Sequence, residues 1–317
     1  MSGSTRLSKI SSCKGFCSAA VLGGLLVGSI PLEAFAFGFD DVARKAEELA
    51  QQGYRAPETS LPDELRELSY TEYSQIQFKR DRDVWSGKGA PFTLSFIHEG
   101  MHYDSAIQLN SIDQEGEVHG FAYNPDDFTY GDLGISDEVT NSDGIGIAGV
   151  RINHAFNEGE CNDEVMVFLG ASYFRAIGEG QVYGLSGRGL AVDTGLPSGE
   201  EFPRFTEIWV VEPGPESQYL TIFALLDSPS VTGAYRFVLR PGDDTLVDVQ
   251  SRLYLRRAVE KLGIAPLTSM YLYGPEQPSS TQHYIPAIHD SNGLLINDAE
   301  NGWLWRPLAN PARLMMN

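Results

Sequence analysis

Residues 205–254 read FTEIWVVEPGPESQYLTIFALLDSPSVTGAYRFVLRPGDDTLVDVQSRLY. Four segments of this stretch alternate apolar and polar residues, namely 205–211, 219–225, 234–239 and 246–254. Each segment is bounded by Gly, Pro, Asp or Ser, the residues that favour turns. Alternation with a period of two is typical of a strand with one buried face. The stretch therefore predicts four successive strands joined by short connections.

The chain before this stretch predicts a short helical start followed by more strands. Apolar residues recur at helical spacing between Asp40, which suits an N-cap, and Gly53, which suits a helix stop. Two further helical turns are expected at 61–65 and 70–76, and residues 92–97 then alternate as a strand does. Many strands at short intervals with few helices indicate an all-β sandwich or barrel with a short helical N-terminal segment.

The first 36 residues resemble a targeting signal. Arg6, Lys9 and Lys14 precede an apolar run over 19–30, and Ala34-Phe35-Ala36 follows as an A-x-A cleavage site. The run is shorter than the roughly 20 residues that a membrane-spanning helix needs. We therefore expect a signal peptide over 1–36 and an exported protein from residue 37 that does not insert stably into a membrane.

Charge and cysteine content restrict the partners and the chemistry. Residues 37–317 hold 20 basic and 42 acidic residues, a net charge of −22. Such a surface repels phosphate backbones, so we do not expect a nucleic-acid partner. Cys161 is the single cysteine outside the predicted signal peptide, and it cannot form an intramolecular disulfide there. We assign it no role.

Three short motifs match well-known patterns without the structural context that their chemistry needs. HEGMH (98–102) matches the zinc-binding HExxH, but it follows a strand and contains a glycine, so we expect His98 to end a strand and His102 to begin the next. GIGIAG (144–149) matches GxGxxG but follows a polar loop, which favours a glycine-rich strand entry. GLSGR (184–188) lacks the final glycine of a nucleophile elbow. We expect no metal site, no cofactor and no serine hydrolase.

Aromatic, acidic and arginine side chains gather in the turn-rich segments of the second half. Aromatic faces stack on the C–H faces of sugars, and carboxylates and arginines form paired hydrogen bonds with hydroxyls. A structural role remains the commoner one for each residue taken alone, because aromatic residues in strands usually belong to the core. The candidate sugar-binding residues are Tyr173, Arg175, Arg188, Asp193, Glu201 and Tyr235.

Six longer segments carry a family resemblance. They are FLGASYFRA (168–176), VYGLSGRGLAVDTGLPSGEEFPRF (182–205), LLDSPSVTGAYRF (225–237), EKLGIAPLTSM (260–270), IHDSNGL (288–294) and WLWRPLANP (303–311). They closely resemble the periplasmic glucans biosynthesis proteins of types G and D. Type G looks nearer, because type D members usually carry a twin-arginine leader that this sequence lacks.

The resemblance implies a supersandwich domain of the galactose-mutarotase-like kind with a long cleft for glucan. It also implies a periplasmic role in the synthesis of osmoregulated glucans with a β-1,2-linked backbone. In the family a smaller immunoglobulin-like domain follows the sandwich. We therefore expect residues 37–317 to form the glucan-binding sandwich domain, incomplete at its C-terminal end and without the immunoglobulin-like domain. Open sandwich edges of this kind predict poor solubility or pairing with another chain.

The resemblance also implies a catalytic residue. Asp290 of the His-Asp-Ser segment corresponds to the general base of family members that resemble inverting endo-β-1,2-glucanases. An inverting site needs two carboxyl groups about 6.5–9.5 Å apart, and the family's acid lies beyond the segment that ends here at Pro311. Two functions stay open: a glucan-processing enzyme, and a non-catalytic binding protein that guides the glucan past an inner-membrane glucan synthase.

Overall fold

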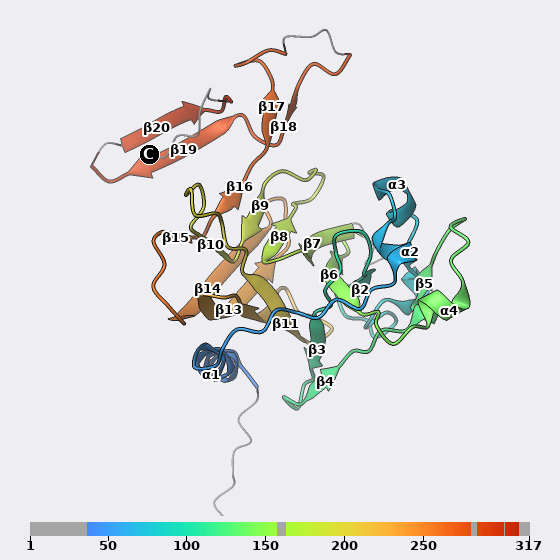
Figure 1. Cartoon of the computed structure of the whole chain (residues 1–317). Coiled ribbons are helices and arrows are strands. Elements are labelled where there is room, and N and C mark those ends of the chain that lie inside the picture. Colours follow the sequence, from blue (N-terminus) through green and yellow to red (C-terminus); the bar gives the residue numbers. More distant parts are fainter. Residues whose placement is uncertain (1–36, 157–162, 280–283, 301, 311–317) are drawn as a thin grey trace, which may run out of the picture. The chain divides into compact units, whose positions relative to one another are not determined.

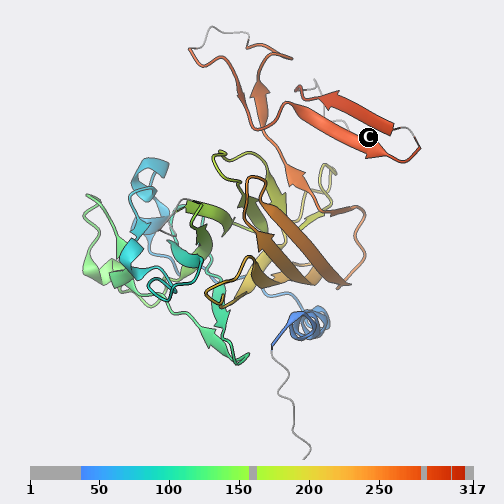
Figure 2. The same ribbon diagram turned by 180° about the vertical axis from the view of Figure 1, so that it is seen from behind.

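The computed structural model describes residues 37–156, 163–279, 284–300 and 302–310. The predicted signal peptide and Cys161 lie outside these residues. Figures 1 and 2 show the elements from two opposite sides. The helices are α1 (Phe39–Ala50), α2 (Asp63–Arg66), α3 (Tyr70–Tyr73) and α4 (Asp137–Thr140), and the 3₁₀ turns are η1 (Arg80–Arg82) and η2 (Pro125–Asp127).

Two six-stranded sheets carry the fold. Sheet I has the order β14 (Leu246–Leu255), β13 (Val231–Arg240), β12 (Leu220–Asp227), β11 (Arg204–Val211), β3 (Gln108–Ile112) and β4 (Val118–Gly120). Sheet II has the order β16 (Leu267–Thr268), β9 (Ser186–Arg188), β8 (Tyr173–Ala176), β7 (Asp163–Leu169), β6 (Ile147–His154) and β2 (Phe92–His98). Neighbours run antiparallel except β11 and β3, which are parallel.

Four two-stranded ladders complete the described elements. They are β1 (Gln77–Phe78) with β5 (Phe128–Thr129), β10 (Leu190–Val192) with β15 (Leu262–Ile264), β17 (Tyr271–Tyr273) with β18 (Ile288–His289), and β19 (Gly293–Asp298) with β20 (Gly302–Pro307). The all-β sandwich predicted from the sequence is confirmed, and the four strands of 205–254 are β11 to β14.

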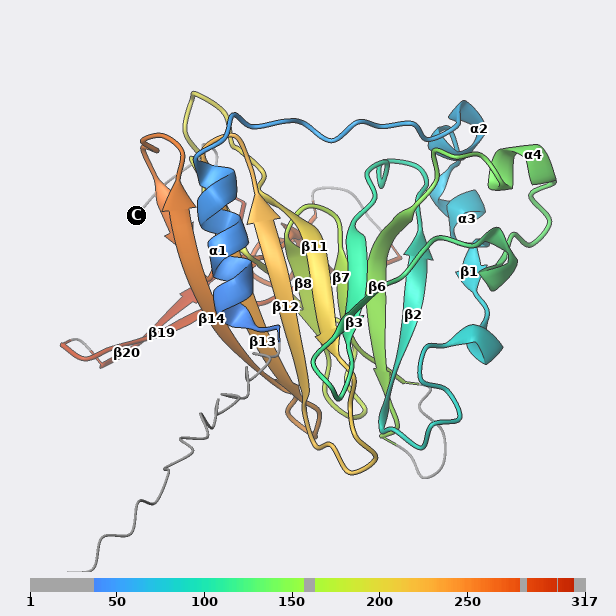
Figure 3. The same ribbon diagram turned by 90° about the horizontal axis from the view of Figure 1, so that it is seen from below.

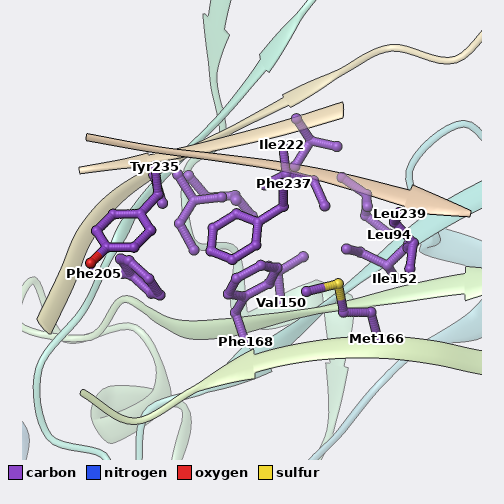
Figure 4. Packing of buried hydrophobic residues seen from close by; sticks show 14 of the residues in the cluster. Leu94, Val150, Ile152, Met166, Phe168, Phe205, Ile222, Tyr235, Phe237 and Leu239 are labelled. Atoms are coloured by element: carbon purple, nitrogen blue, oxygen red, sulfur yellow. The ribbon is translucent and has the colours of Figure 1, made fainter. Parts of the chain in front are cut away.

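The core lies between the inner faces of the two sheets. Figure 4 shows Val150 and Phe168 of sheet II pointing toward Ile222 and Phe237 of sheet I. The rings of Phe168 and Phe237 meet edge to face with centroids 5.1 Å apart, and Phe237 is fully buried. Truncation of such a phenylalanine to alanine typically costs about 3–5 kcal/mol, so this layer holds the sheets together.

Helix α1 covers the other face of sheet I. Figure 3 shows it lying across β12, β13 and β14. Its buried residues Val42, Ala43 and Ala46 pack in one cluster with Trp209 and Phe223. Because α1 covers one side of β12 and the core covers the other, this strand is buried over most of its length. It is a nearly continuous apolar run and not the alternating segment expected over 219–225.

The start of α1 differs from the sequence expectation. Asp40 was expected to be the N-cap, but the helix begins at Phe39 and Gly38 is the N-cap. The backbone N–H of Gly38 donates to Asp41 Oδ2 at 2.9 Å, so the carboxylate that supports this helix start comes from within the first turn. The helical turns expected at 61–65 and 70–76 are confirmed as α2 and α3.

Sheet II faces the core with one side only. In β8, Phe174 and Ala176 pack on the core cluster, so Tyr173 and Arg175 point to the opposite face. The predicted glycine-rich strand entry is confirmed, since residues 144–146 lead into β6 and residues 147–149 begin it. A Cβ at Gly149 would lie 2.3 Å from the carbonyl oxygen of Phe168, which explains why this close strand pair requires a glycine.

Candidate functional site

The outer face of sheet II, opposite the core, carries two hollows. A first hollow of about 800 Å³ is lined by residues of β7 and β8 and of the loops around them, among them His102, Val167, Tyr173, Arg175 and Phe202. Its volume is in the range typical of small-ligand sites. The lining combines aromatic rings with an arginine, as a sugar-binding surface does.

A second hollow of about 510 Å³ continues along the same face. It shares Tyr103, Leu169 and Arg175 with the first hollow. We call the two hollows together the outer groove. An extended groove suits a long polymer better than a closed pocket does. The outer groove crosses the strands β2, β6, β7 and β8.

Strand register explains how the groove-lining side chains come together. Ser95 of β2 pairs with Arg151 of β6, Arg151 pairs with Val167 of β7, and Val167 pairs with Arg175 of β8. These four residues form one row across sheet II and all line the outer groove. The row mixes polar and apolar groups because the face is open to solvent.

Arg188 of β9 contacts the aromatic wall of the first hollow from the neighbouring strand, where it is the cross-strand partner of Tyr173. Its guanidinium carbon lies 5.3 Å from the ring centroid of Tyr173 and 5.2 Å from that of Phe202, within the range of cation–π attraction. Arg188 is buried and forms an ion pair with Glu200 at 2.7 Å. The pair fixes the guanidinium, which in turn orients the two rings.

The candidate residues predicted from the sequence separate into three groups. Tyr173 and Arg175 line the outer groove. Arg188 and Tyr235 line a different and largely apolar hollow of about 340 Å³, which Arg175 also borders. Tyr235 is buried, and its hydroxyl donates to the Gly189 carbonyl oxygen at 2.7 Å.

Asp193 and Glu201 hold turns. Asp193, at a positive φ of 57°, accepts hydrogen bonds from the backbone N–H groups of Glu260 and Lys261. Glu201 accepts from the backbone and hydroxyl of Ser230. Burial alone would raise the pKa of Glu201, but hydrogen bonds from the neighbouring serines and Arg257 lower it, so the carboxylate stays ionised.

Asp290 lies directly after β18, in the ladder that β17 and β18 form. Its side chain is exposed, and Oδ2 accepts from the backbone N–H of Met270 at 3.1 Å. Its own N–H donates to the Met270 carbonyl oxygen at 2.8 Å. Asp290 is not among the described residues that line the outer groove. Its assignment as general base stays a prediction.

The HEGMH segment is a strand end and a turn, without the helix that a zinc protease needs. His98 ends β2 as predicted, whereas His102 lies in the turn and not at the start of β3. Glu99 Oε2 accepts from the backbone N–H of Gly146 at 2.6 Å. At Gly100 a Cβ would lie 2.6 Å from the ring of Tyr73, so the glycine allows the ring to approach.

Several groove residues were missed by the sequence reasoning. They include Asp83, Ser95, Tyr103, Arg151, Asn153 and Glu164. The available signal was the polar residue at every second position of β6, where Arg151 and Asn153 alternate with buried Val150 and Ile152. That alternation shows which side chains of β6 point away from the core. It does not show which side chains of other strands they contact.

One exposed acidic group could be read as a metal site. Among the described residues, the ligand atoms of Asp113, Glu117 and His119 lie within 4.8 Å of one another. Asp113 Oδ1 accepts from two backbone N–H groups of its own turn, and Oδ2 bonds His119 at 2.6 Å. These contacts explain why the three side chains lie together: they stabilise the turn between β3 and β4.

The fold and the groove together define a β-sandwich protein with an open aromatic and polar groove on one sheet. The chain belongs to the family described as "Periplasmic glucan biosynthesis protein, MdoG", whose model matches residues 37–317. The family resemblance found in the sequence is thereby confirmed. Within the described ranges, no helix has both the length and the apolar character that a membrane span requires.

Curated relatives carry the name Glucans biosynthesis protein G. The protein from Dickeya dadantii (strain 3937) is 49% identical over 297 residues, which cover 94% of this chain and 56% of the relative. The proteins from Pseudomonas putida strains KT2440 and W619 are each 50% identical over 300 residues, or 95% of this chain and 52% and 51% of the relatives. The chain thus spans about half the length of these relatives. Family and names support a role in periplasmic glucan biosynthesis.

Proposed function

We propose that this chain binds a β-1,2-linked glucan backbone along the outer groove during glucan synthesis in the periplasm. The observation that carries the proposal is the pair of adjoining hollows on sheet II, which share lining residues and have aromatic rings and arginines on their walls. Tyr173 offers a half-buried ring for stacking on a sugar face, and the exposed Arg175 offers a planar set of donors for hydroxyls.

Glucan processing is a second candidate, with Asp290 as the general base of an inverting hydrolysis. The His-Asp-Ser segment that carries this residue supports it. Asp290 is an exposed carboxylate held by one backbone N–H, so it has room to accept a proton from a water molecule. Its absence from the lining of the two hollows among the described residues favours binding over cleavage by this chain. The binding role is compatible with guiding the glucan past an inner-membrane glucan synthase.

Calorimetric titration with linear β-1,2-glucan tests the binding proposal. We expect Tyr173→Ala and Arg175→Ala each to weaken binding about tenfold, the effect of losing about 1.4 kcal/mol. Tyr219→Ala and Arg44→Ala are matched controls, because both side chains are exposed and neither lines the groove. A wild-type chain that binds no β-1,2-glucan would contradict the proposed function.

The same titration mixtures separate binding from processing. They are analysed for reducing ends and for short oligosaccharides after prolonged incubation. Release of oligosaccharides by the wild-type chain, abolished by Asp290→Asn, would establish the enzymatic candidate. Binding without any release supports the non-catalytic role.

A further inference from the structure

The second hollow contains a chain of polar contacts that joins three elements. The Ser95 hydroxyl of β2 donates to Asp83 Oδ1 at 2.7 Å, and Asn153 Nδ2 of β6 donates to the Ser95 oxygen at 2.8 Å. Asp83 directly follows η1. All three residues line the hollow, so this network is part of the groove wall.

An ion pair lies beside this network. Arg151 Nε of β6 lies 2.9 Å from Glu164 Oε2 of β7. Strand register pairs Arg151 with Ser95 and Glu164 with Asn153, so the ion pair and the network are direct cross-strand neighbours. We call Asp83, Ser95, Arg151, Asn153 and Glu164 the polar end of the outer groove.

The charges of the second hollow are nearly balanced. Its lining holds two carboxylates, Asp83 and Glu164, and three arginines, Arg80, Arg151 and Arg175. A site for an anion would be dominated by positive groups, and a site for a cation by carboxylates. A balanced set of charged donors and acceptors suits a neutral ligand rich in hydroxyl groups, since a hydroxyl both donates and accepts.

Both carboxyl groups retain capacity for a ligand. A carboxylate accepts up to about four hydrogen bonds, whereas the Ser95 hydroxyl supplies one to Asp83. The Arg151 and Glu164 side chains keep 39% and 26% of their surface exposed, so their ion pair is open to the hollow. Burial raises the pKa of Asp83 and of Glu164, because the charged form of a carboxyl group is less well solvated there than in open water.

An ion pair between neighbouring strands could also serve the sheet alone. Exposed pairs of this kind contribute little to stability, about 0–1 kcal/mol. A purely structural function would not require Asp83, Ser95 and Asn153 to continue the contacts along the same wall. The wall also includes Tyr73 and Tyr103, whose ring centroids lie 5.7 Å apart, so flat apolar surface borders the polar groups.

We propose that the polar end of the outer groove is a distinct subsite that binds the hydroxyl groups of one sugar residue of the glucan. Asp83 and Glu164 accept from sugar hydroxyls, and Arg151 donates to them. Asn153 donates to Ser95 and Thr93 and so holds the serine hydroxyl that binds Asp83. The proposal rests on the proposed function, because it takes the glucan to lie along the whole groove. It adds that the polar end, and not only the aromatic wall of the first hollow, determines affinity.

The test is calorimetric titration of long linear β-1,2-glucan into the wild-type chain and into Glu164→Gln and Asp83→Asn. Each substitution keeps the shape of the side chain and removes its charge. We expect each to weaken binding about tenfold, the usual effect of losing a hydrogen bond to a charged group. Glu212→Gln is the matched control, since Glu212 forms a 2.8 Å ion pair with Lys88 outside the groove. Far-UV circular dichroism and thermal melting show that each variant is folded.

The outcomes separate the two proposals. If the wild-type chain binds no glucan, the proposed function fails and the subsite fails with it. If Tyr173→Ala weakens binding but Glu164→Gln and Asp83→Asn leave it unchanged, the glucan occupies the first hollow alone and the subsite is overturned. Because Asp83 and Glu164 belong to different elements, a folding defect in one variant leaves the other to decide.

Discussion

The stability of this protein should depend on pH through one buried histidine. His98 ends β2 and is only 2% exposed. Its Nε2 lies 2.9 Å from the Tyr123 hydroxyl and 3.2 Å from the Tyr130 hydroxyl, and its Nδ1 contacts the Glu99 carbonyl oxygen. Since a carbonyl only accepts, Nδ1 carries the proton and Nε2 accepts from a tyrosine hydroxyl. The ring is therefore neutral in the folded protein.

The size of the effect follows from the pKa. Burial lowers the pKa of His98 from 6.5 to about 4. Between these values the unfolded chain binds the proton and the folded chain does not, so the free energy of unfolding rises with pH through this window. One pKa unit corresponds to about 1.4 kcal/mol, which makes the full effect about 3 kcal/mol. This contribution to the free energy of unfolding is complete at neutral pH and decreases as the pH falls from 6.5 toward 4. At pH 5 the expected loss is about 2 kcal/mol.

Urea unfolding at pH 7 and pH 5, followed by tryptophan fluorescence, measures this loss. The wild-type chain is compared with His98→Gln, whose side chain stays neutral at both values. The pKa of His154 is also lowered by burial, but its contribution is common to both proteins and cancels in the comparison. We expect the wild-type chain to lose about 2 kcal/mol more than the variant. Equal losses in the two proteins would refute the reasoning, because His98 would then titrate as an exposed histidine does.

Two core substitutions give further tests, each by urea unfolding at pH 7. Tyr235→Phe leaves the buried Gly189 carbonyl without its hydroxyl donor and should lower the free energy of unfolding by about 1–2 kcal/mol; no change would show that the carbonyl finds another donor. Gly149→Ala places a Cβ against the Phe168 carbonyl oxygen and should cost about 1–3 kcal/mol. Its control is Gly53→Ala, which meets nothing within 4 Å and should leave the stability unchanged within about 0.5 kcal/mol.

Local sequence signals predicted most of the strands but not the layers around them. The period-two pattern and the turn residues between 205 and 254 located β11 to β14, because strand preference and turn chemistry act over a few residues. The same pattern could not show that α1 covers the outer face of sheet I. Trp209 illustrates this: it lies in one of the alternating segments, but only the packing of α1 explains why it is 1% exposed.

The sequence by itself determined the all-β class and the family. It also placed Tyr173 and Arg175 among the candidates, and both line the outer groove. Only the tertiary structure decided which polar residues share that groove. Arg151 and Glu164 form an ion pair because β6 and β7 pair in one particular register. Asp193 and Glu201 instead accept hydrogen bonds that stabilise turns. Register depends on how whole sheets pack, and that information is not contained in any short segment of the chain.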